Sequence, residues 1–265
     1  MRRGTDPQVS VVRVRFPQER HQQMIDLIAE RGRVATAELA TLFDVSLATA
    51  RRDLDVLEHA GLVSRTHGGV VLRGRNDGST EPLFLEKLRQ HQNLKQRIGI
   101  AAAEELPDGK VAILDSGTTT LAIARAIAGR PVTIVTIDLK VAEAAASGAT
   151  EVHLVGGHVR NGYFSIVGAW ATSALQSIRA DVAFMAADAI DEAGITNSTF
   201  DEAEVKRVVL SRASRCVLVA DHSKLGARSF ADVCPLDEVD LFVTDRGAEP
   251  MIGPYRQKIR DIRLV

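Results

Sequence analysis

Apolar side chains in the first third of the chain recur at the spacing of an amphipathic helix. Gln18–Arg31 follows this pattern, and Gly32 comes directly after it. Apolar positions three to four residues apart are typical of a helix that buries one side. The side chains on the apolar face are Met24, Leu27 and Ile28. We therefore expect a first helix over these residues.

Two further helices are predicted on either side of a tight turn. Thr36 can cap a helix over Ala37–Phe43, because a hydroxyl can accept a hydrogen bond from a backbone N–H of the first turn. Ser46 is the corresponding N-cap candidate for a helix over Leu47–His59. The apolar stripe of this last helix, at positions i, i+4 and i+7, consists of Ala50, Leu54 and Leu57.

A short two-stranded ribbon is predicted behind these helices. Gly61 can end the preceding helix in a left-handed conformation. Residues 62–71 then alternate apolar and polar side chains across the pair Gly68 and Gly69. Three helices followed by a basic ribbon predict a winged helix-turn-helix.

The pattern changes after residue 110, where short apolar runs alternate with helical segments. Repeated β-α alternation is typical of a mostly parallel sheet with helices on both faces. The predicted strands are Val111–Leu114, Val132–Thr136, Val152–Val155, Val182–Met185, Cys216–Ala220, Leu241–Thr244 and Ile262–Val265. The predicted helices between them are Thr120–Ala128, Leu139–Ala146, Ala169–Ile178 and Glu202–Ala213. The fold class is α/β: an N-terminal winged helix-turn-helix plus a C-terminal, mostly parallel, three-layer α/β/α effector domain.

These patterns divide the chain into four parts. Residues 1–17 are an irregular extension and 18–73 are the winged helix-turn-helix. Residues 74–80, which are polar and contain glycine, are a linker, and 81–265 form the α/β domain. Within that domain Glu81–Leu106 is predicted as one or two helices. The cations expected on their solvated side are Lys87, Arg89, Lys95 and Arg97.

Composition narrows the class of protein. Of 265 residues, 45% are apolar and 25% charged, which is ordinary for a globular protein, and no apolar run is long enough for a membrane span. The first residues lack the apolar core of a secretion signal, and Cys216 and Cys234 imply no disulfide framework, so a reducing cytoplasm is expected. Residues 1–75 carry 12 Lys and Arg against 9 Asp and Glu, whereas the remaining 190 carry 21 against 25. A small basic module on a mildly acidic body suits a DNA reader with a separate sensor.

The exposed side of the predicted helix Leu47–His59 carries the candidate DNA contacts. Small residues near the tip of such a helix, with arginines close behind, let a side chain reach a base edge or a phosphate in a major groove. The predicted DNA-binding residues are Thr36, Ser46, Ala48, Thr49, Arg51, Arg52, Arg65 and His67. The alternative is that the two adjacent arginines form a solvated face and the helical hairpin is only packing.

Several predicted strands end in polar residues or glycine, and one such end carries a phosphate motif. The carboxyl ends of parallel strands face the ligand crevice. Residues 114–120 run from a strand through a hydroxyl-rich turn into a helix, where Gly117 lets backbone N–H groups converge on an anion. The motif is neither a Walker A loop nor G-x-G-x-x-G, which favours a small phosphate over a nucleotide. The alternative is a simple helix cap.

Two further charged pairs are candidates for the same crevice. Glu202 and Lys206 are four residues apart on a predicted helix, and the alternative is an ordinary surface ion pair. Asp221 and Lys224 follow a buried strand and could hold a sugar hydroxyl and a phosphate, or pair with each other.

The segment VSLATARRDLDVLEHAGLVSRTHGGVV resembles the signature of the DeoR family of bacterial transcription regulators. ILDSGTTT, VGG, EAEVKR and VADHSKLG resemble landmarks of that family's effector domain, whose fold is similar to ribose-phosphate isomerase, so the resemblance covers roughly residues 18–265. It implies a phosphorylated sugar effector. The phosphate is then expected on Asp115, Ser116, Gly117, Thr118, Thr119 and Thr120. The sugar is expected near Asp138, Gly156, Gly157, Asp188, Glu202, Lys206, Asp221 and Lys224. Ile137 and Ala189 depart from the family pattern and could alter which sugar fits.

These observations favour a transcription regulator, which we expect to be a repressor of carbohydrate-metabolism genes. We expect it to bind a double-stranded DNA operator as a homodimer or higher homo-oligomer. No cofactor is implied. The seven histidines show no metal-ligand spacing and no serine has a recognisable His-Asp arrangement, so neither a metal site nor nucleophilic catalysis is expected. The alternatives are an isomerase-like enzyme that carries a DNA module, with Glu202 or Asp188 as a base, and a DNA-architectural protein without a crevice.

Overall fold

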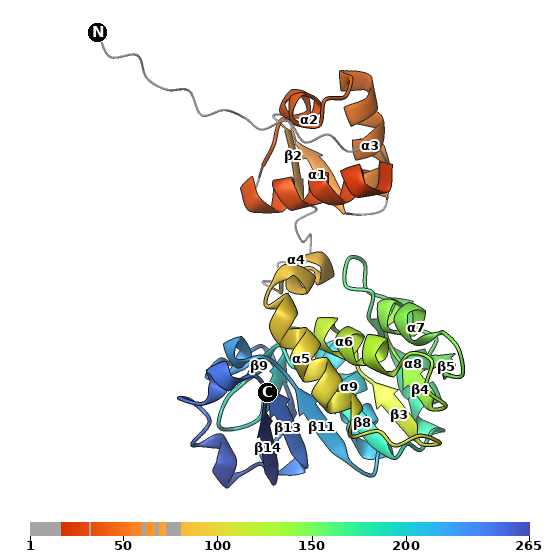
Figure 1. Ribbon diagram of the computed structural model, residues 1–265, viewed down its shortest axis with the longest axis vertical. Helices are drawn as coiled ribbons and strands as arrows, with labels where there is room; N and C mark the ends of the chain where they lie inside the picture. The colour runs from red at the N-terminus through yellow and green to blue at the C-terminus, as the bar shows by residue number, and fades with distance from the viewer. Residues whose placement is uncertain (1–16, 32, 60–61, 67–68, 73–80) are drawn as a thin grey trace. The chain divides into compact units, whose positions relative to one another are not determined.

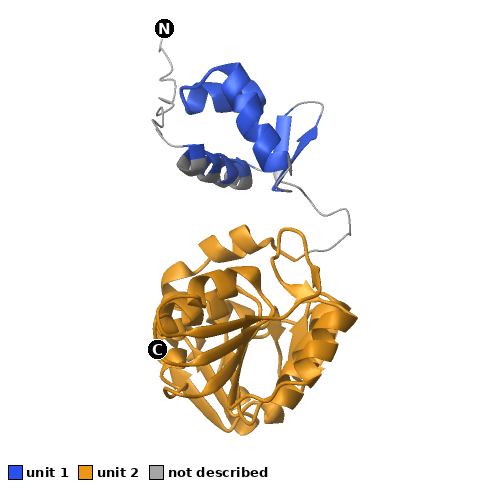
Figure 2. Cartoon of the chain, turned by 90° about the vertical axis from the view of Figure 1, so that its right-hand side faces the viewer, with its two compact units in different colours: residues 1–79 blue, residues 80–265 orange. Residues whose placement is uncertain are grey.

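The computed structural model describes residues 17–31, 33–59, 62–66, 69–72 and 81–265. The chain forms two compact units, residues 1–79 and residues 80–265 (Figure 2). The predicted extension up to residue 16, the predicted linker and the turn residues Gly61, His67 and Gly68 lie outside the described residues.

The first unit is the predicted winged helix-turn-helix. The helices are α1 (Pro17–Arg31), α2 (Thr36–Leu42) and α3 (Leu47–His59), and the antiparallel strands β1 (Val63–Thr66) and β2 (Gly69–Leu72) form the wing. The predicted stripe of α3 is buried, with Ala50 and Leu54 fully inaccessible and Leu57 at 2% exposure. The fold class of this half is therefore confirmed.

The two predicted caps have different outcomes. The Oγ of Ser46 accepts a hydrogen bond from the backbone N–H of Thr49 at 3.1 Å, as a capping hydroxyl should. The prediction for Thr36 is wrong, because Thr36 is the first residue of α2 and Ala35 is the N-cap, without a side-chain cap. The helix begins one residue earlier than its sequence pattern indicates.

The second unit is built on a seven-stranded sheet whose neighbouring strands are all parallel. In spatial order its strands are β14 (Asp261–Leu264), β13 (Leu241–Thr244), β11 (Cys216–Val219), β8 (Val182–Met185), β3 (Val111–Leu114), β4 (Thr133–Thr136) and β5 (Glu151–Leu154). Each predicted strand is present, with its bounds shifted by at most one residue.

Helices cover both faces of this sheet, so the predicted three-layer α/β/α arrangement is confirmed (Figure 1). One apolar core packs beneath α5 (Gln92–Ala103), α6 (Thr118–Ile127) and α7 (Leu139–Ala145). The other packs beneath α8 (Ala169–Gln176) and α9 (Phe200–Arg212). Gly99 lets α5 approach α6 closely, because a Cβ at that position would lie 2.7 Å from Ala122.

Two short helices precede the sheet where one or two were expected. α4 (Phe84–Arg89) and α5 are separated at His91, whose φ of 54° is left-handed and ends any continuous helix. Tertiary contacts also produce short strands that the sequence pattern does not indicate. These are β6 (His158–Val159), β7 (Ile166–Val167), β9 (Ala189–Ile190), β10 (Ile195–Asn197) and β12 (Ala231–Cys234). Within the described part of the chain, no helix is long and apolar enough to span a membrane.

Candidate functional site

The loop after β3 forms one wall of a cavity at the carboxyl end of the sheet. Residues 115–117 lead directly into α6, and Gly117 adopts a φ of 137° that favours glycine. The cavity has a volume of about 60 Å³. The predicted effector residues that line it are Ser116, Gly117, Thr118, Thr119, Asp188, Glu202, Lys206, Asp221 and Lys224. Residues from four separate parts of the sequence are thus brought together.

The other predicted effector residues do not line the cavity. They are Asp115, Thr120, Asp138, Gly156 and Gly157. The two departures from the family pattern, Ile137 and Ala189, are buried and also lie outside the lining. The predicted set therefore contains residues that line the cavity and residues that do not, some of which support the lining from behind.

Asp115 and Asp138 are such supports. Asp115 is fully buried, and its Oδ2 accepts the Lys206 ammonium and the backbone N–H of Ala186 at 2.9 Å. Asp138 accepts backbone N–H bonds from Lys140 at 2.7 Å and from Gly117 at 3.2 Å. Burial raises the pKa of the Asp138 carboxyl to about 6, although these N–H groups oppose the shift. Both carboxylates therefore help to fix the loop that follows β3 and lines the cavity.

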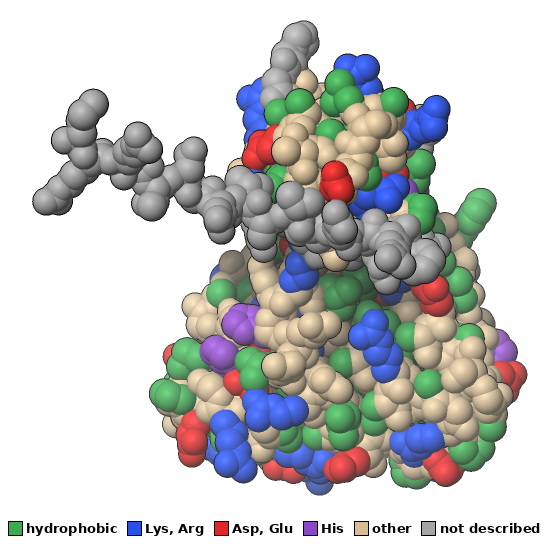
Figure 3. All heavy atoms as spheres, turned by 45° about the horizontal axis from the view of Figure 1, so that its top comes forward, with side chains coloured by type: hydrophobic (Ala, Val, Ile, Leu, Met, Phe, Trp, Pro, Cys, Tyr) green, Lys and Arg blue, Asp and Glu red, His purple; other side chains and the backbone are tan. Residues whose placement is uncertain are grey.

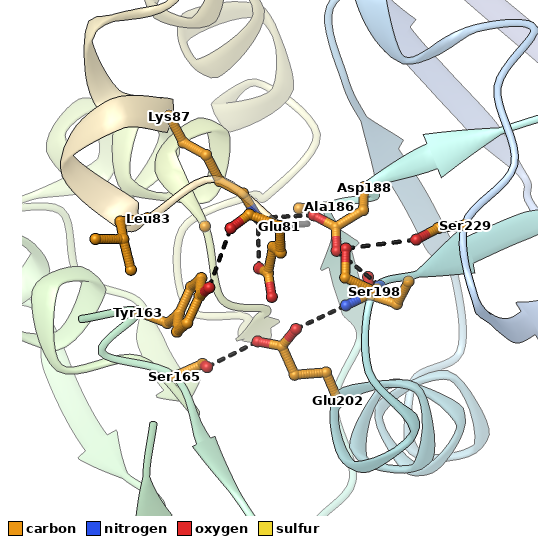
Figure 4. A network of polar contacts seen from close by, with 12 residues as sticks. Glu81, Leu83, Lys87, Tyr163, Ser165, Ala186, Asp188, Ser198, Glu202 and Ser229 are labelled. Carbon is orange, nitrogen blue, oxygen red and sulfur yellow. Dashed lines mark hydrogen bonds and ion pairs between the residues drawn. The ribbon is translucent and has the colours of Figure 1, made fainter. Parts of the chain in front are cut away.

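Three acidic side chains that line the cavity, Glu81, Asp188 and Glu202, converge on one another (Figure 4). Two cations join them. Lys87 Nζ lies 2.7 Å from both Glu81 Oε1 and Asp188 Oδ1. Arg160 lies 2.7 Å from Glu81 and 2.6 Å from Glu202. Burial alone would raise the pKa of Asp188, but Lys87 holds it below its usual range. The cluster is a network of ion pairs in which two cations are shared among three carboxylates.

Glu202 and Lys206 are buried at 5% and 2% exposure and have different partners. Glu202 accepts hydrogen bonds from Ser165 and Asn197, each at 2.7 Å, while Lys206 binds Asp115. The alternative that these two residues form an ordinary surface ion pair is therefore wrong.

Asp221 and Lys224 both line the cavity and do not form an ion pair with each other. The Asp221 carboxylate accepts hydrogen bonds from the Ser223 backbone N–H at 3.1 Å and from its hydroxyl at 2.5 Å. The Lys224 ammonium remains at the cavity wall.

Sequence reasoning missed the wall contributed by α4 and α5. The prediction that Lys87 and Lys95 are solvated is wrong, since Lys87 is held in the ion-pair network and Lys95 is only 6% exposed. The signal for Lys95 was present, because Lys95, Ile98 and Ala102 are spaced as one helical stripe. The other unpredicted lining residues that offer polar groups are Glu81, Gln90, His91, Tyr163, Asn197 and Ser223.

In the first unit, the predicted DNA-binding face of α3 is accessible. Ser46, Ala48, Arg51 and Arg52 are exposed, and Thr36 and Thr49 are half-buried. Basic side chains stand on the surface of this unit, with a few acidic ones between them (Figure 3).

Arg65 differs from the arginines of α3, because it is engaged within the unit. Its guanidinium lies 2.5 Å from Asp55 and 3.5 Å from Glu58, and it donates to the Arg51 carbonyl oxygen at 2.9 Å. These contacts fasten the wing to α3. His67, the remaining predicted DNA contact, lies outside the described residues.

Two known protein families match different parts of the chain. Residues 20–75 match the DeoR-like helix-turn-helix domain, and residues 90–246 match the DeoR C-terminal sensor domain. The HTH-type transcriptional regulator GlpR of Haloferax volcanii is 36% identical over 87% of this chain and 90% of its own length. The HTH-type transcriptional repressor GlcR of Bacillus subtilis is 32% identical over 87% and 89%. The glycerol-3-phosphate regulon repressor of Escherichia coli is 31% identical over 86% and 90%.

Among solved structures, ribose 5-phosphate isomerase A of Methanocaldococcus jannaschii aligns with 51% of this chain and 55% of its own, at 19% identity and a TM-score of 0.39. That likeness is too weak to bear on function. The sensor-domain match, by contrast, spans more than half of the chain, and the relatives align over most of it. This protein therefore belongs to the DeoR family of transcriptional regulators.

Proposed function

We propose that this regulator is a repressor of carbohydrate-metabolism genes whose affinity for operator DNA is set by a phosphorylated sugar. The observation that carries the proposal is the cavity itself. One wall presents backbone N–H groups and hydroxyls at the start of a helix, and the other presents carboxylate and amide groups. A phosphate and a polyol are the two chemical groups that these walls complement.

The phosphate would lie on Ser116, Gly117, Thr118 and Thr119, where the N-terminus of α6 offers N–H groups without an intrahelical partner and a partial positive charge. The N–H of Gly117 itself already donates to Asp138. Lys224 lines the same cavity and would add a full positive charge. Asp115, Asp138 and Thr120 would act by keeping this loop in shape, since they do not line the cavity.

The sugar hydroxyls would meet Asp188, Asn197 and Asp221. Carboxylate oxygens accept and amide N–H groups donate, so together they can read hydroxyl positions. Glu202 already accepts from Ser165, Asn197 and Arg160, so its role would be to orient these neighbours. A general base needs a free carboxylate near the substrate. Glu202 is engaged by these partners and Asp188 by Lys87, so neither candidate base supports the isomerase alternative.

On the DNA side, Arg51 and Arg52 with Ala48 and Thr49 would face the major groove as α3 enters it. We infer a homodimer or higher oligomer, because two recognition helices on two half-sites supply affinity that one small basic module does not. The relatives named as repressors support the direction of control.

The test combines both sites in the full chain. Selection from a random duplex library would first identify the operator, and a thermal-shift screen would identify the sugar phosphate that raises the unfolding temperature. Fluorescence anisotropy then measures operator affinity with and without that ligand. We expect a change of about 5- to 150-fold, the range of an ordinary allosteric coupling. The proposal would be refuted if no sugar phosphate raised the unfolding temperature, or if the stabilising ligand left operator affinity unchanged.

The isomerase alternative is tested in parallel. Incubation with phosphorylated pentoses and hexoses under conditions of measured binding, followed by NMR, should leave each sugar unchanged. Steady conversion of any of them would make the chain an enzyme.

A further inference from the structure

Residues 81–91, here called the proximal segment, are the first described residues after the predicted linker. Their start is tied to the cavity. The Glu81 carboxylate lies 2.7 Å from Lys87 and 2.7 Å from Arg160, and its carbonyl oxygen accepts the Tyr163 hydroxyl at 3.1 Å. Because Glu81 contacts cavity residues directly, a ligand that shifts these residues can also shift the start of the proximal segment.

Lys95 holds the other end of the proximal segment. Its Nζ donates to the carbonyl oxygens of Lys87 and of Gln90, the latter at 2.7 Å. These carbonyls belong to the last turn of α4, where a helix has no backbone donors of its own. Because α4 has only six residues, such an external donor matters for its order.

The same ammonium lines the cavity that contains the phosphate loop. An ammonium has three N–H donors, and the two hydrogen bonds to α4 leave one for a ligand. Burial, together with the nearby Lys224 and Lys87, lowers the pKa of Lys95 to about 8 against the opposing effect of Asp221. A doubly charged phosphate nearby would favour the protonated form again.

We propose that Lys95 is a ligand of the effector phosphate and that it links phosphate binding to the order of the proximal segment. The link is its pair of hydrogen bonds to the carbonyl oxygens of Lys87 and Gln90. The inference rests on the proposed function, since it presumes a phosphate on Ser116–Thr119. With phosphate bound, Lys95 remains an ammonium with three hydrogen bonds and fastens the C-terminal end of α4. The residues that follow the linker are thereby ordered when the cavity is filled.

Inorganic phosphate serves as the probe, on the full chain. Calorimetry gives its affinity, and hydrogen–deuterium exchange read by mass spectrometry follows the amides of residues 84–95. We expect phosphate to slow exchange there by about threefold or more, because opening of α4 becomes rarer. Residues 261–265, at the edge of the sheet, serve as the internal reference.

Lys95→Met removes both the charge and the donors. We expect phosphate affinity to fall by about tenfold or more, as the loss of a buried cationic ligand implies. When parent and Lys95→Met are equally saturated with phosphate, phosphate should no longer slow the exchange of residues 84–95 in the variant. Lys110→Met is the matched control, because Lys110 pairs with Asp181 on the surface and does not line the cavity.

A pH profile separates a ligand from a merely structural lysine and does not depend on the Met variant being folded. Phosphate stays doubly charged from pH 8 to 9.5, so the affinity of the parent should drop by about tenfold over this range as Lys95 loses its proton. The charged groups around it, Lys87, Lys224, Asp221 and His91, are unchanged in Lys95→Arg. Because Arg stays charged, that variant should change by less than about threefold.

The outcomes distinguish the inference from the proposed function. Phosphate binding by the parent without slowed exchange in residues 84–95 would overturn the role of Lys95 directly. Equal phosphate affinity in parent and Lys95→Met, or equal pH profiles in parent and Lys95→Arg, would do the same. In each of these cases a chain that still binds phosphorylated sugars keeps its proposed function. If the parent bound neither phosphate nor any phosphorylated sugar, both the role of Lys95 and the proposed function would be refuted.

Discussion

The arginines of the first unit differ in whether their guanidinium groups already form ion pairs with nearby carboxylates. Arg65 is engaged by Asp55 and Glu58, and it would have to give up these carboxylates before it met a DNA phosphate. Arg51 is exposed and forms no ion pair with another residue that the structure describes. A free guanidinium on the recognition helix can fork onto guanine or hold a phosphate at no such cost. Arg51 is therefore the stronger candidate for a direct contact.

We expect Arg51→Ala to weaken operator binding by at least about 1 kcal/mol, roughly fivefold, while sugar-phosphate binding is unchanged. Fluorescence anisotropy on the selected operator measures the first and calorimetry the second. Arg256→Ala, which makes the same charge change on the exposed surface of the second unit, should bind DNA like the parent. If Arg51→Ala retained parental affinity, the assignment of this face to the groove would be wrong.

At the other site, Thr118 is the first residue of α6 and lines the cavity. Thr118→Asp would place a carboxylate against the effector phosphate, and repulsion between like charges should abolish the effect of the sugar on DNA binding. Thr118→Ser keeps the hydroxyl and should respond like the parent. Circular dichroism and the unfolding temperature show whether each variant is folded. A full response from folded Thr118→Asp would take this loop out of the phosphate site.

Elements differ in how far the sequence determines them. The strands β3, β8 and β13 of the large sheet are apolar runs that are almost wholly buried, and they are predicted with their correct bounds. The strands β6 and β9 have two residues each and exist through their pairing partners, which no local pattern reveals. The cavity is predicted on the sheet side, where strand ends mark it, and missed on the α4 and α5 side. There, a lysine on a helix is usually solvated, and only its packing shows otherwise.

Asp138 joins two elements, because it caps α7 and also holds the N–H of Gly117 before α6. Its pKa of about 6 in the folded chain exceeds the unfolded value near 3.8. Between these values the folded state binds more protons than the unfolded state, so this group makes stability fall as pH rises from about 4 to 6. The loss amounts to roughly 2–3 kcal/mol at full burial.

Asp138→Asn removes that titration. We expect the stability of the parent relative to the Asn variant to decline from pH 4 to pH 6 and to stay level above about pH 7, as denaturant melts of both proteins at each pH would show. The side-chain amide cannot accept from Gly117 N–H on its NH₂ side, so sugar-phosphate affinity should also fall. A parent-minus-variant difference that is independent of pH would mean that folding leaves the pKa of Asp138 unchanged.

At the scale of the whole molecule, the two proposed sites belong to different compact units. All residues that line the cavity fall between 81 and 224, and the predicted DNA contacts fall between 36 and 67. Each unit has a buried apolar core of its own. The two proposed sites therefore have no side chain in common. Its effect requires two arrangements of the chain or of the oligomer that differ in affinity for both ligands.

Such a coupling has to be reciprocal. If the sugar phosphate changes operator affinity by some factor between about 5 and 150, the operator must change sugar-phosphate affinity by the same factor. Calorimetric titration of the full chain with the sugar, alone and saturated with operator, and anisotropy with and without saturating sugar measure the two factors independently. We expect them to agree within about twofold, since both report one coupling free energy of about 1–3 kcal/mol. In Thr118→Asp, the sugar should not change operator affinity and the operator should not change sugar affinity. If the sugar altered DNA binding while bound operator left sugar affinity untouched, the ligand would be acting outside the equilibrium between arrangements of this chain, and control by the cavity would have to be abandoned.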